Sequence, residues 1–265
     1  MRRPLCSSLP RPACWQRMID LHAHILPGMD DGAPSLTASL EMALLAVESG
    51  VKAMAATPHC GLPDGDGPDA RQVRAAAARL GRALERAGIP LRLYAGMEIF
   101  GTAQTAQRLR EGTLIPLAGS RYPLIEFPFE GYARQATQIL EAVLRLGLRP
   151  IVAHPERYRY AQAEPRLLNE WVDMGCLLQI NRGSLLGRFG PREETLAHRL
   201  IGRGFAAFVA SDAHTPVVRT PWLRDVWALL CHEYSEETAR LLLEENPARV
   251  LGNRAIDMDE PEWFD

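Results

Sequence analysis

Short apolar or β-branched runs alternate along the chain with longer segments whose apolar residues recur every three or four positions. The short runs predict strands over 18–21, 51–56, 91–95, 122–127, 150–153, 177–180 and 205–210. The longer segments predict helices over 35–49, 70–87, 103–110, 134–146, 165–174, 192–203, 222–231 and 236–244. Gly50, Gly175 and Gly204 directly follow predicted helices, and glycine readily ends a helix. The pattern therefore predicts strand and helix in alternation.

This alternation predicts an α/β fold in which helices join parallel strands. Seven strand–helix units within 265 residues fit a closed or nearly closed barrel better than an open doubly wound sheet. The first strand is not followed by a glycine-rich dinucleotide fingerprint, which also argues against the open sheet. Because no composition break divides the chain, we expect a single domain over 18–255 and a C-terminal tail over 256–265.

Residues 1–17 differ from the rest of the chain, because they contain four arginines, three prolines and no acidic residue. The Arg2-Arg3 pair could belong to an export signal, but the apolar segment that such a signal needs does not follow it. We therefore expect either a disordered extension or a start codon assigned too early, with translation beginning at Met18.

Composition and charge exclude several classes of function. The formal net charge of −2 gives no electrostatic basis for binding nucleic acid or an anionic membrane. Apolar runs in the sequence stay well below the roughly 18 residues that span a bilayer, so we expect no direct membrane insertion. The five cysteines are irregularly spaced, which argues against a disulfide framework and favours a reducing, cytoplasmic location.

Side chains that can bind metal ions follow the predicted strands at the points where the strands end. They are His22, His24, Asp30, Asp31, His59, Glu98, Glu126, His154, Asp212 and His214, with Arg157 and Arg219 nearby in the sequence. Because the carboxyl ends of the strands of a parallel barrel meet at one mouth, we expect these side chains to lie together.

The residue types and spacings favour a site for several metal ions. Positions i and i+2 of a strand face the same way, so His22 and His24 could chelate one ion, as could Asp212 and His214. Imidazole combined with carboxylate favours Zn, Mn, Fe or similar ions, and about nine ligands fit two or three of them. A lone histidine after a strand is usually a solvated loop residue, but five of the seven histidines lie at these strand ends.

Cys176 and Arg182 suggest a different phosphatase chemistry, because their C-x5-R spacing is the minimal signature of cysteine-dependent tyrosine phosphatases. Such a loop cradles phosphate with backbone N–H groups and is normally rich in glycine. The intervening Leu-Leu-Gln-Ile-Asn instead indicates a buried strand. We therefore expect Cys176 to be a small, unreactive core residue.

The strand-end motifs resemble those of the PHP (polymerase and histidinol phosphatase) superfamily, and within it the bacterial capsular-polysaccharide tyrosine phosphatases. The motifs are Met-Ile-Asp-Leu-His-Ala-His-Ile-Leu-Pro-Gly-Met-Asp-Asp-Gly (18–32), Ala-Thr-Pro-His (56–59), Gly-Met-Glu-Ile (96–99), Leu-Ile-Glu-Phe (124–127), Ala-His-Pro-Glu-Arg (153–157) and Ala-Ser-Asp-Ala-His (210–214). They are spread over most of the chain after Met18, and the His-Ile-Leu-Pro-Gly-x-Asp-Asp-Gly run is specific to this branch.

The resemblance implies a distorted seven-stranded β/α barrel with a centre of three divalent metal ions. Mn²⁺ is the expected ion, with Fe, Zn, Co and Mg as alternatives. The implied metal ligands are His22, His24, Asp31, His59, Glu98, Glu126, His154, Asp212 and His214. The resemblance also marks Arg157 and Arg219 as phosphate-binding, and we take these two arginines and His154 as the expected catalytic residues.

The resemblance further implies activity on phosphotyrosine, typically on the tail of a bacterial tyrosine autokinase that controls exopolysaccharide and capsule synthesis. In the expected reaction, a hydroxide that bridges metal ions attacks phosphorus in line while Arg157 and Arg219 hold the phosphoryl oxygens. Two alternatives stay open. One is a small-molecule phosphatase of the same fold that acts on histidinol phosphate or a nucleotide, and the other is a metal-binding regulator without turnover.

Two further features concern how a substrate enters the site. Cys60 stands where relatives often have a second histidine or another polar residue, and the loop over 61–68 departs from the family pattern. Aromatic residues that follow ligand-bearing strands could flank an aromatic substrate or only pack the barrel rim; they are Phe129, Tyr132, Tyr158 and Tyr160.

Overall fold

The computed structural model describes residues 17–62 and 67–265, so the expectations for residues 1–16 and for 63–66 in the loop over 61–68 lie outside the described residues. The strands are β1 (Met18–Ala23), β2 (Val51–Ala56), β3 (His59–Cys60), β4 (Arg92–Ala95), β5 (Glu98–Phe100), β6 (Leu124–Glu126), β7 (Ile151–Ala153), β8 (Leu177–Asn181) and β9 (Ala206–Ala210). They pair in parallel, in a three-stranded sheet ordered β1-β2-β4 and a six-stranded sheet ordered β3-β5-β6-β7-β8-β9.

Two of the predicted strands continue past a break, and the breaks separate the two sheets. β2 continues into β3 through Pro58, which has no N–H group to donate, and β4 continues into β5 through Gly96. Backbone hydrogen bonds bridge both breaks, from Gly96 N to Ala56 O at 3.0 Å and from Glu98 N to Pro58 O at 3.1 Å. With each interrupted strand counted once, the described residues contain seven parallel strand units, which confirms the predicted α/β class.

The two sheets approach each other along a narrow seam between β1 and the end of β9. A bridge pairs Ala23 with Ala213, and His24 N donates to Ala213 O at 2.8 Å. Further along the seam, toward the start of β1, the side chain of Asp20 accepts hydrogen bonds from Ser211 where a regular sheet would have backbone-to-backbone hydrogen bonds. The buried carboxylate of Asp20 accepts hydrogen bonds from Ser211 N at 3.0 Å and from Ser211 Oγ at 2.5 Å. The barrel is therefore distorted at the side where β1 meets β9.

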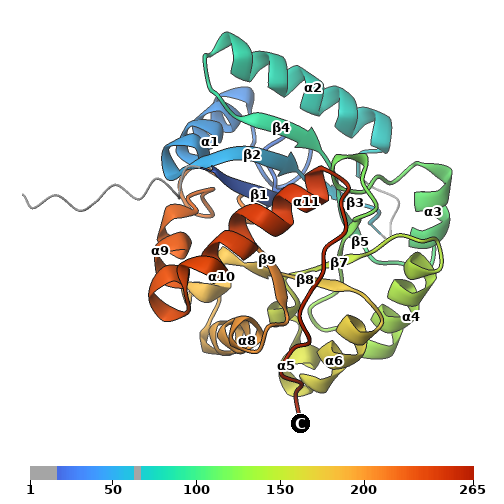
Figure 1. The fold of residues 1–265 in the computed structure, drawn as a ribbon. Helices are drawn as coiled ribbons and strands as arrows, with labels where there is room; N and C mark the ends of the chain where they lie inside the picture. The colour runs from blue at the N-terminus through green and yellow to red at the C-terminus, as the bar shows by residue number, and fades with distance from the viewer. Residues whose placement is uncertain (1–16, 63–66) are drawn as a thin grey trace, which may run out of the picture.

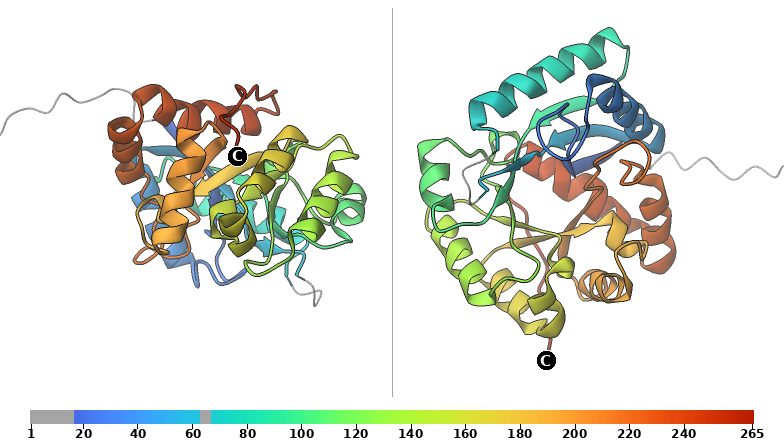
Figure 2. Two further views of the ribbon diagram at one scale, coloured as in Figure 1. Left: turned by 90° about the horizontal axis from the view of Figure 1, so that it is seen from below. Right: turned by 180° about the vertical axis from the view of Figure 1, so that it is seen from behind.

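Helices surround the ring of strands on its outer side (Figure 1 and Figure 2). The predicted helices are present as α1 (Leu36–Ser49), α2 (Ala70–Arg86), α3 (Thr105–Glu111), α4 (Ala133–Leu144), α6 (Arg166–Asp173), α8 (Pro191–Gly202), α9 (Arg224–Glu233) and α10 (Glu236–Arg240), which continues as the π-helical turn Leu241–Glu245. The sequence pattern missed three short helices, α5 (Arg159–Ala163), α7 (Arg182–Leu185) and α11 (Asn246–Leu251). Within residues 17–62 and 67–265, every helix is too short or too polar to cross a membrane.

Local signals in the sequence set where the helices begin and end. At the start of α1, Ser35 Oγ accepts a hydrogen bond from Ala38 N at 3.3 Å. Asp69 and Gln72 form a capping box at the start of α2, with both hydrogen bonds at 2.8 Å. Gly50 follows α1 with a φ of 107°, a left-handed conformation that favours glycine and lets the chain turn directly into β2.

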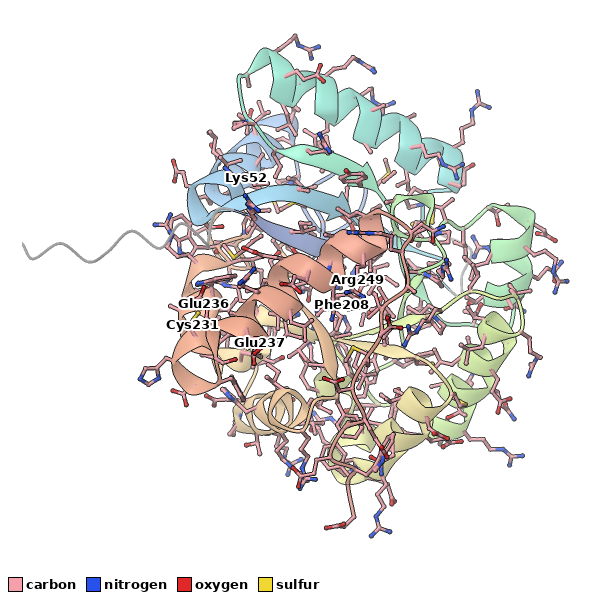
Figure 3. The ribbon with its side chains drawn as sticks, in the orientation of Figure 1. Lys52, Phe208, Cys231, Glu236, Glu237 and Arg249 are labelled. Carbon is pink, nitrogen blue, oxygen red and sulfur yellow. The ribbon has the colours of Figure 1, made fainter. Side chains whose placement is uncertain are left out.

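Two apolar layers hold the strands in place. The larger buried cluster lies between the strands and the outer helices. The smaller one fills the inside of the barrel and includes Leu124 and Phe208 from strands together with Val250 of α11. α11 crosses one end of the barrel, and Phe208 is labelled beside it in Figure 3. Apolar side chains therefore close this end of the barrel interior.

The C-terminal segment over 256–265 continues from α11 across the same face of the molecule (Figure 1). The side chains of Ile256 and Phe264 are buried. Phe264 is fixed at both backbone polar groups, because its N donates to Asn169 Oδ1 at 3.1 Å and its O accepts from Asn169 Nδ2 at 2.8 Å. The expected tail thus packs against the barrel.

Candidate metal centre

The side chains expected at the strand ends gather at the mouth of the barrel. We call them the polar cluster, which comprises His22, His24, Asp31, His59, Glu98, Glu126, His154, Asp212 and His214. Their possible ligand atoms form three groups, each within 4.8 Å: His22, His24, Glu98 and Asp212; His24, Asp31, His59 and His214; and His59, Glu98 and Glu126. His154 joins through Glu98, whose Oε1 lies 2.9 Å from His154 Nε2. The fold thus brings every predicted ligand together.

Glu98 lies at the centre of the polar cluster, at the start of β5, and its side chain is buried. Its Oε2 atom lies 3.1 Å from His22 Nε2, from His24 Nε2 and from His59 Nδ1. Despite these distances, Oε2 has no hydrogen-bond partner among the described residues. A buried carboxylate oxygen without a hydrogen bond is costly. Three imidazole nitrogens that face one carboxylate oxygen are an arrangement that suits a metal centre, so these residues fit the implied ions.

His22 and His24 reach the cluster from the end of β1 because positions i and i+2 face the same way in a strand. Their Nε2 atoms lie 3.3 Å apart, although two imidazole nitrogens can share a hydrogen bond only if one of them carries a proton. The opposite nitrogen of each ring has its own partner. His22 Nδ1 lies 2.9 Å from Gln179 Oε1, and His24 Nδ1 lies 2.6 Å from Asp30 Oδ2. The rings are therefore held with Nε2 directed into the cluster, as in metal sites.

Asp212 occupies the opposite side of the seam and has a left-handed backbone with a φ of 50°. Its Oδ1 atom lies 3.5 Å from His22 Nε2 and 3.4 Å from His24 Nε2. His154 is also left-handed, with a φ of 35°. Residues other than glycine rarely adopt this conformation, which costs free energy and often marks a functional position. Two members of the polar cluster therefore carry backbone strain that aims their side chains at the mouth.

The remaining members line the more open side of the polar cluster. His59 Nδ1 lies 3.0 Å from Glu126 Oε1, and its Nε2 atom lies 3.6 Å from Asp31 Oδ1. Asp31 Oδ1 also lies 3.4 Å from His214 Nε2. The side chain of Asp31 is 65% exposed, in contrast to the buried Glu98. A ligand that approaches the mouth from solvent would meet Asp31 and His59 first.

Three residues support the possible ligands: Gln179 and Asn181, which are neutral and were not predicted, and Asp30, which the sequence offered only as a possible ligand. Gln179 and Asn181 alternate along the apolar strand β8, and this inward polar pair was the available signal. Asn181 Nδ2 donates to Asp212 Oδ2. The carboxylate of Asp30 accepts a hydrogen bond from His59 N at 3.0 Å and also contacts His24 Nδ1. These residues orient possible ligands without facing the centre themselves.

Gly32 lets the loop that carries Asp30 approach β1 closely. A Cβ atom at this position would overlap His24 O and His24 Cβ. Gly32 N donates to Asp30 Oδ1 at 3.0 Å, so the same glycine also holds the carboxylate that orients His24. The glycine of the Asp-Asp-Gly run is therefore required by packing against the metal-binding strand.

The two arginines expected to bind phosphate lie beside Asp212. Arg219 Nη2 donates to Asp212 Oδ2, and Arg157 Nη1 lies 3.4 Å from the same oxygen. Phe189, which no sequence motif indicated, places its ring 4.4 Å from Arg157 Cζ and 5.9 Å from Arg219 Cζ. Phe129 also lies 4.4 Å from Arg157 Cζ. Both guanidinium groups are thus held next to the polar cluster by one carboxylate and by aromatic rings.

The four aromatic residues considered for substrate contact have different environments. Tyr158 is fully buried, donates to Ala153 O at 2.6 Å and accepts from Phe127 N at 3.1 Å, so it is part of the barrel packing. Tyr160 stacks on Tyr158 with ring centroids 5.4 Å apart. Phe129 is 39% exposed and Tyr132 is 80% exposed, and these two remain available to a substrate.

The C-x5-R segment and Cys60 lack the features of a reactive cysteine site. Cys176 is buried directly before β8, and burial raises the pKa of its thiol to about 12. Arg182 pairs with Asp225 instead of facing a phosphate loop. The thiol of Cys60 is buried, donates to Pro58 O at 3.3 Å and has a raised pKa because of that burial. Both thiols are therefore core residues, as expected for Cys176.

Carboxylates and imidazoles of the polar cluster shift the pKa values of one another. Burial alone would raise the pKa of Glu98, but His22 and His154 hold it well below its usual range. Burial alone would lower the pKa of His59, but the carboxylates of Glu126 and Glu98 raise it to about 9. The raised pKa values of His22, His24 and His59 mean that protons on these imidazoles offset the charge of the buried carboxylates when metal ions are absent, whereas burial lowers the pKa of His214 to about 4.

We expect metal loading to release protons, because an ion and a proton compete for the same imidazole lone pair. Without metal, His59 with a pKa of about 9 is protonated near neutral pH. So is His24, whose pKa is raised by Asp212 and Asp30 against the effect of burial. The apparent affinity for Mn²⁺ should therefore rise with pH throughout the range below about pH 9. Titration of MnCl₂ into weakly buffered protein, followed by the change in pH, measures the number of protons released per ion bound. An affinity for Mn²⁺ that does not change between about pH 6 and 8 would contradict the expectation.

Comparison with known proteins gives one consistent result. Residues 18–252 match the family described as capsular polysaccharide synthesis, CpsB/CapC. The chain is similar to the tyrosine-protein phosphatase YwqE of Bacillus subtilis, at 38% identity over 248 residues that cover 92% of this chain and 96% of that protein. It is also similar to the tyrosine-protein phosphatase CpsB of Streptococcus agalactiae, at 29% identity over 244 residues that cover 90% and 100% of the two proteins.

The fold agrees with these sequence matches. A crystal structure from a study of YwqE from Bacillus subtilis and CpsB from Streptococcus pneumoniae, described as unique metal-dependent tyrosine phosphatases, superposes with a TM-score of 0.88. It is 37% identical in sequence, and the match covers 94% of this chain and 100% of that chain. The region matched to the family contains the whole polar cluster and both arginines.

Proposed function

This chain belongs to the CpsB/CapC family of capsular polysaccharide synthesis, and we propose that it is a metal-dependent protein-tyrosine phosphatase. The observation that supports this most directly is the geometry around Glu98, where three imidazole nitrogens lie 3.1 Å from one carboxylate oxygen. Arg157 and Arg219 lie at the edge of the same site. A metal centre with adjacent guanidinium groups suits the hydrolysis of a phosphate ester.

We propose that the polar cluster holds three divalent ions, with Mn²⁺ as the expected one. The three overlapping groups of candidate ligands support this number, and Glu98 belongs to two of them and His24 to two. The ligands are imidazoles and carboxylates, which suit Mn, Fe, Zn or Co better than an ion that prefers thiolates. When bound, such ions act as Lewis acids and lower the pKa of coordinated water.

The residues of the chain have distinct parts in the proposed reaction. Arg157 and Arg219 bind phosphoryl oxygens with their N–H groups and offset the negative charge that develops in the transition state. In the structure both point at Asp212 Oδ2, so the phosphate would bind next to this carboxylate. His154 supports the site from the buried side through its contact with Glu98.

We propose phosphotyrosine on the tail of a bacterial tyrosine kinase as the substrate, with control of capsule or exopolysaccharide synthesis as the role and the cytoplasm as the location. A phenolate is a better leaving group than an alkoxide, because its conjugate acid has a pKa of about 10. The exposed Phe129 and Tyr132 lie on the segment after β6, where an aromatic side chain of a substrate could pack against them.

Metal analysis combined with a turnover assay tests the proposal. We expect protein stripped with a chelator to lose at least about 100-fold in kcat/KM on a phosphotyrosine peptide and to regain it with Mn²⁺, because the Lewis acid is then restored. Histidinol phosphate and a nucleoside monophosphate should be turned over much more slowly in the same assay. Equal activity with and without metal would refute the mechanism. A preference for either small substrate would assign the site to small molecules, and complete inactivity would favour a metal-binding regulator.

A further inference from the structure

Phe189 lies in the turn between α7 and α8, directly beside the two arginines of the site. Its ring centroid is 4.4 Å from Arg157 Cζ and 5.9 Å from Arg219 Cζ. Phe129 lies 4.4 Å from Arg157 Cζ as well, so two aromatic rings contact this guanidinium group. Arginine is attracted to the face of an aromatic ring at such distances, and the attraction is stronger where water is partly excluded.

The arrangement of charges explains why an aromatic partner is useful at this place. Arg157 and Arg219 share the single oxygen Asp212 Oδ2, although two guanidinium groups repel each other. The other oxygen of Asp212 faces His22 Nε2 at 3.5 Å and His24 Nε2 at 3.4 Å, so this carboxylate is not available to the arginines alone. An aromatic face attracts a guanidinium group without occupying its N–H donors. Apart from the contacts with Asp212 and the contact of Arg219 Nη1 with His214 Nε2 at 3.2 Å, the other N–H donors of the two arginines can bind the oxygens of a phosphate.

The glycine at position 183 leaves space for the ring of Phe189. A Cβ atom on Gly183 would lie 2.5 Å from Phe189 Cε2 and 2.7 Å from Phe189 Cζ. Gly183 lies inside α7 and does not have a positive φ, so its backbone does not require glycine. Gly187 and Gly190 flank Phe189 with φ values of 66° and 127°, and this backbone brings the ring back over α7. Gly183 therefore leaves space for the Phe189 ring, and Gly187 and Gly190 allow the backbone turn that positions it.

We propose that Phe189 is a positioning residue that holds Arg157 and Arg219 in the orientation that receives a phosphoryl group, and that Gly183 is small because the ring of Phe189 packs on it. The proposal rests on the phosphatase function and adds to it a residue outside the polar cluster. Phe189 acts through the arginines, since its own side chain offers neither a proton nor a ligand atom.

The first test compares Phe189→Leu with Phe189→Tyr in metal-loaded protein, by affinity for inorganic phosphate and by turnover of a phosphotyrosine peptide. Leucine keeps the apolar bulk but removes the aromatic face, so phosphate affinity and kcat/KM should fall together by about 3- to 30-fold. Tyrosine keeps the face and should stay within about 3-fold of the parent protein. Metal content should be unchanged in both variants, because Phe189 is not one of the proposed ligands.

Phe264→Leu is the matched control. Phe264 also lies against arginines, with its ring 4.8 Å from Arg199 Cζ and 5.1 Å from Arg203 Cζ, but it belongs to the C-terminal segment. This variant should share any loss of thermal stability and leave phosphate affinity unchanged. Equal phosphate affinity in Phe189→Leu and the parent protein would overturn the proposal, as would an equal loss in Phe189→Leu and Phe264→Leu.

A double-mutant cycle tests the assigned role of Gly183. Gly183→Ala should displace the ring and weaken phosphate binding by about the same factor as Phe189→Leu. In a Phe189→Ala background the ring is gone, so Gly183→Ala should have no further effect on phosphate affinity. Additive losses would overturn the link between the two residues. Protein that binds phosphate but does not turn over a phosphotyrosine peptide would contradict the proposed function, while its phosphate affinities would still decide the role of Phe189.

Discussion

Replacing Glu98 by glutamine is expected to lower kcat/KM toward a phosphotyrosine peptide by about 1,000-fold or more, equivalent to about 4 kcal/mol of transition-state stabilisation. The reason is the central place of Glu98, whose Oε2 lies 3.1 Å from each of three imidazole nitrogens and whose Oε1 lies 2.9 Å from a fourth. An amide keeps the shape of the side chain but removes the charge and places N–H hydrogens where a cation should bind. Elemental analysis should therefore show less metal per protein.

Glu130→Gln is the matched control for this result. Glu130 lies on the segment after β6, and its side chain is 77% exposed and paired with Arg159. The same charge is removed there, so neither metal content nor turnover should change. If Glu98→Gln retained full metal content and more than a tenth of the parent activity, the assignment of the polar cluster as the metal centre would be wrong.

The second large effect is expected for Asp212→Asn, which should lower kcat/KM by about 100- to 1,000-fold while the protein stays folded. Asp212 joins two parts of the site, because Oδ1 faces His22 and His24 whereas Oδ2 contacts Arg157 and Arg219. Asparagine removes the charge that holds both sets of groups. Asparagine also tolerates the left-handed backbone at a φ of 50° better than most residues do.

A comparison with Asp212→Ala separates charge from backbone strain. Both variants should lose activity to a similar extent, since both lack the carboxylate. Alanine should in addition lower the free energy of unfolding by about 1 kcal/mol more than asparagine, because it accommodates the left-handed conformation less well. Thermal unfolding of metal-free samples measures this difference. Full activity of Asp212→Asn would show that the carboxylate charge is not needed by either the ions or the arginines.

The fold and the residues that gather in the polar cluster could be predicted from the sequence, because both follow from the geometry of parallel strands. Parallel strands bring their carboxyl ends to one mouth, and His22 and His24 share a face because they are two residues apart in a strand. The short helices escaped prediction for an equally physical reason. α7 spans Arg182–Leu185, which is too short to display a helical period. Its conformation depends on contacts such as the hydrogen bond from Gly183 N to Asn181 Oδ1 at 2.8 Å.

The residues that support the site were harder to predict than the possible ligands. Asp30 and Asp31 are neighbours of the same type, yet only Asp30 reaches His24 Nδ1, at 2.6 Å, while the side chain of Asp31 is 65% exposed. Their difference arises from the turn that Gly32 allows. Phe189 has no polar group to suggest function and lies far in sequence from Arg157. Its contact exists only after α7 has folded against the barrel.

The narrow seam between β1 and β9 has a consequence for how the barrel holds its ions. His22 and His24 stand on one edge of this seam and Asp212 stands on the other, with Asp20 and Ser211 behind them. An ion bound by His22, His24 and Asp212 would connect β1 to the segment after β9, where few backbone hydrogen bonds join the two strands. We therefore expect opening of this seam to weaken the binding of such an ion, so that conditions that loosen the seam should speed metal exchange.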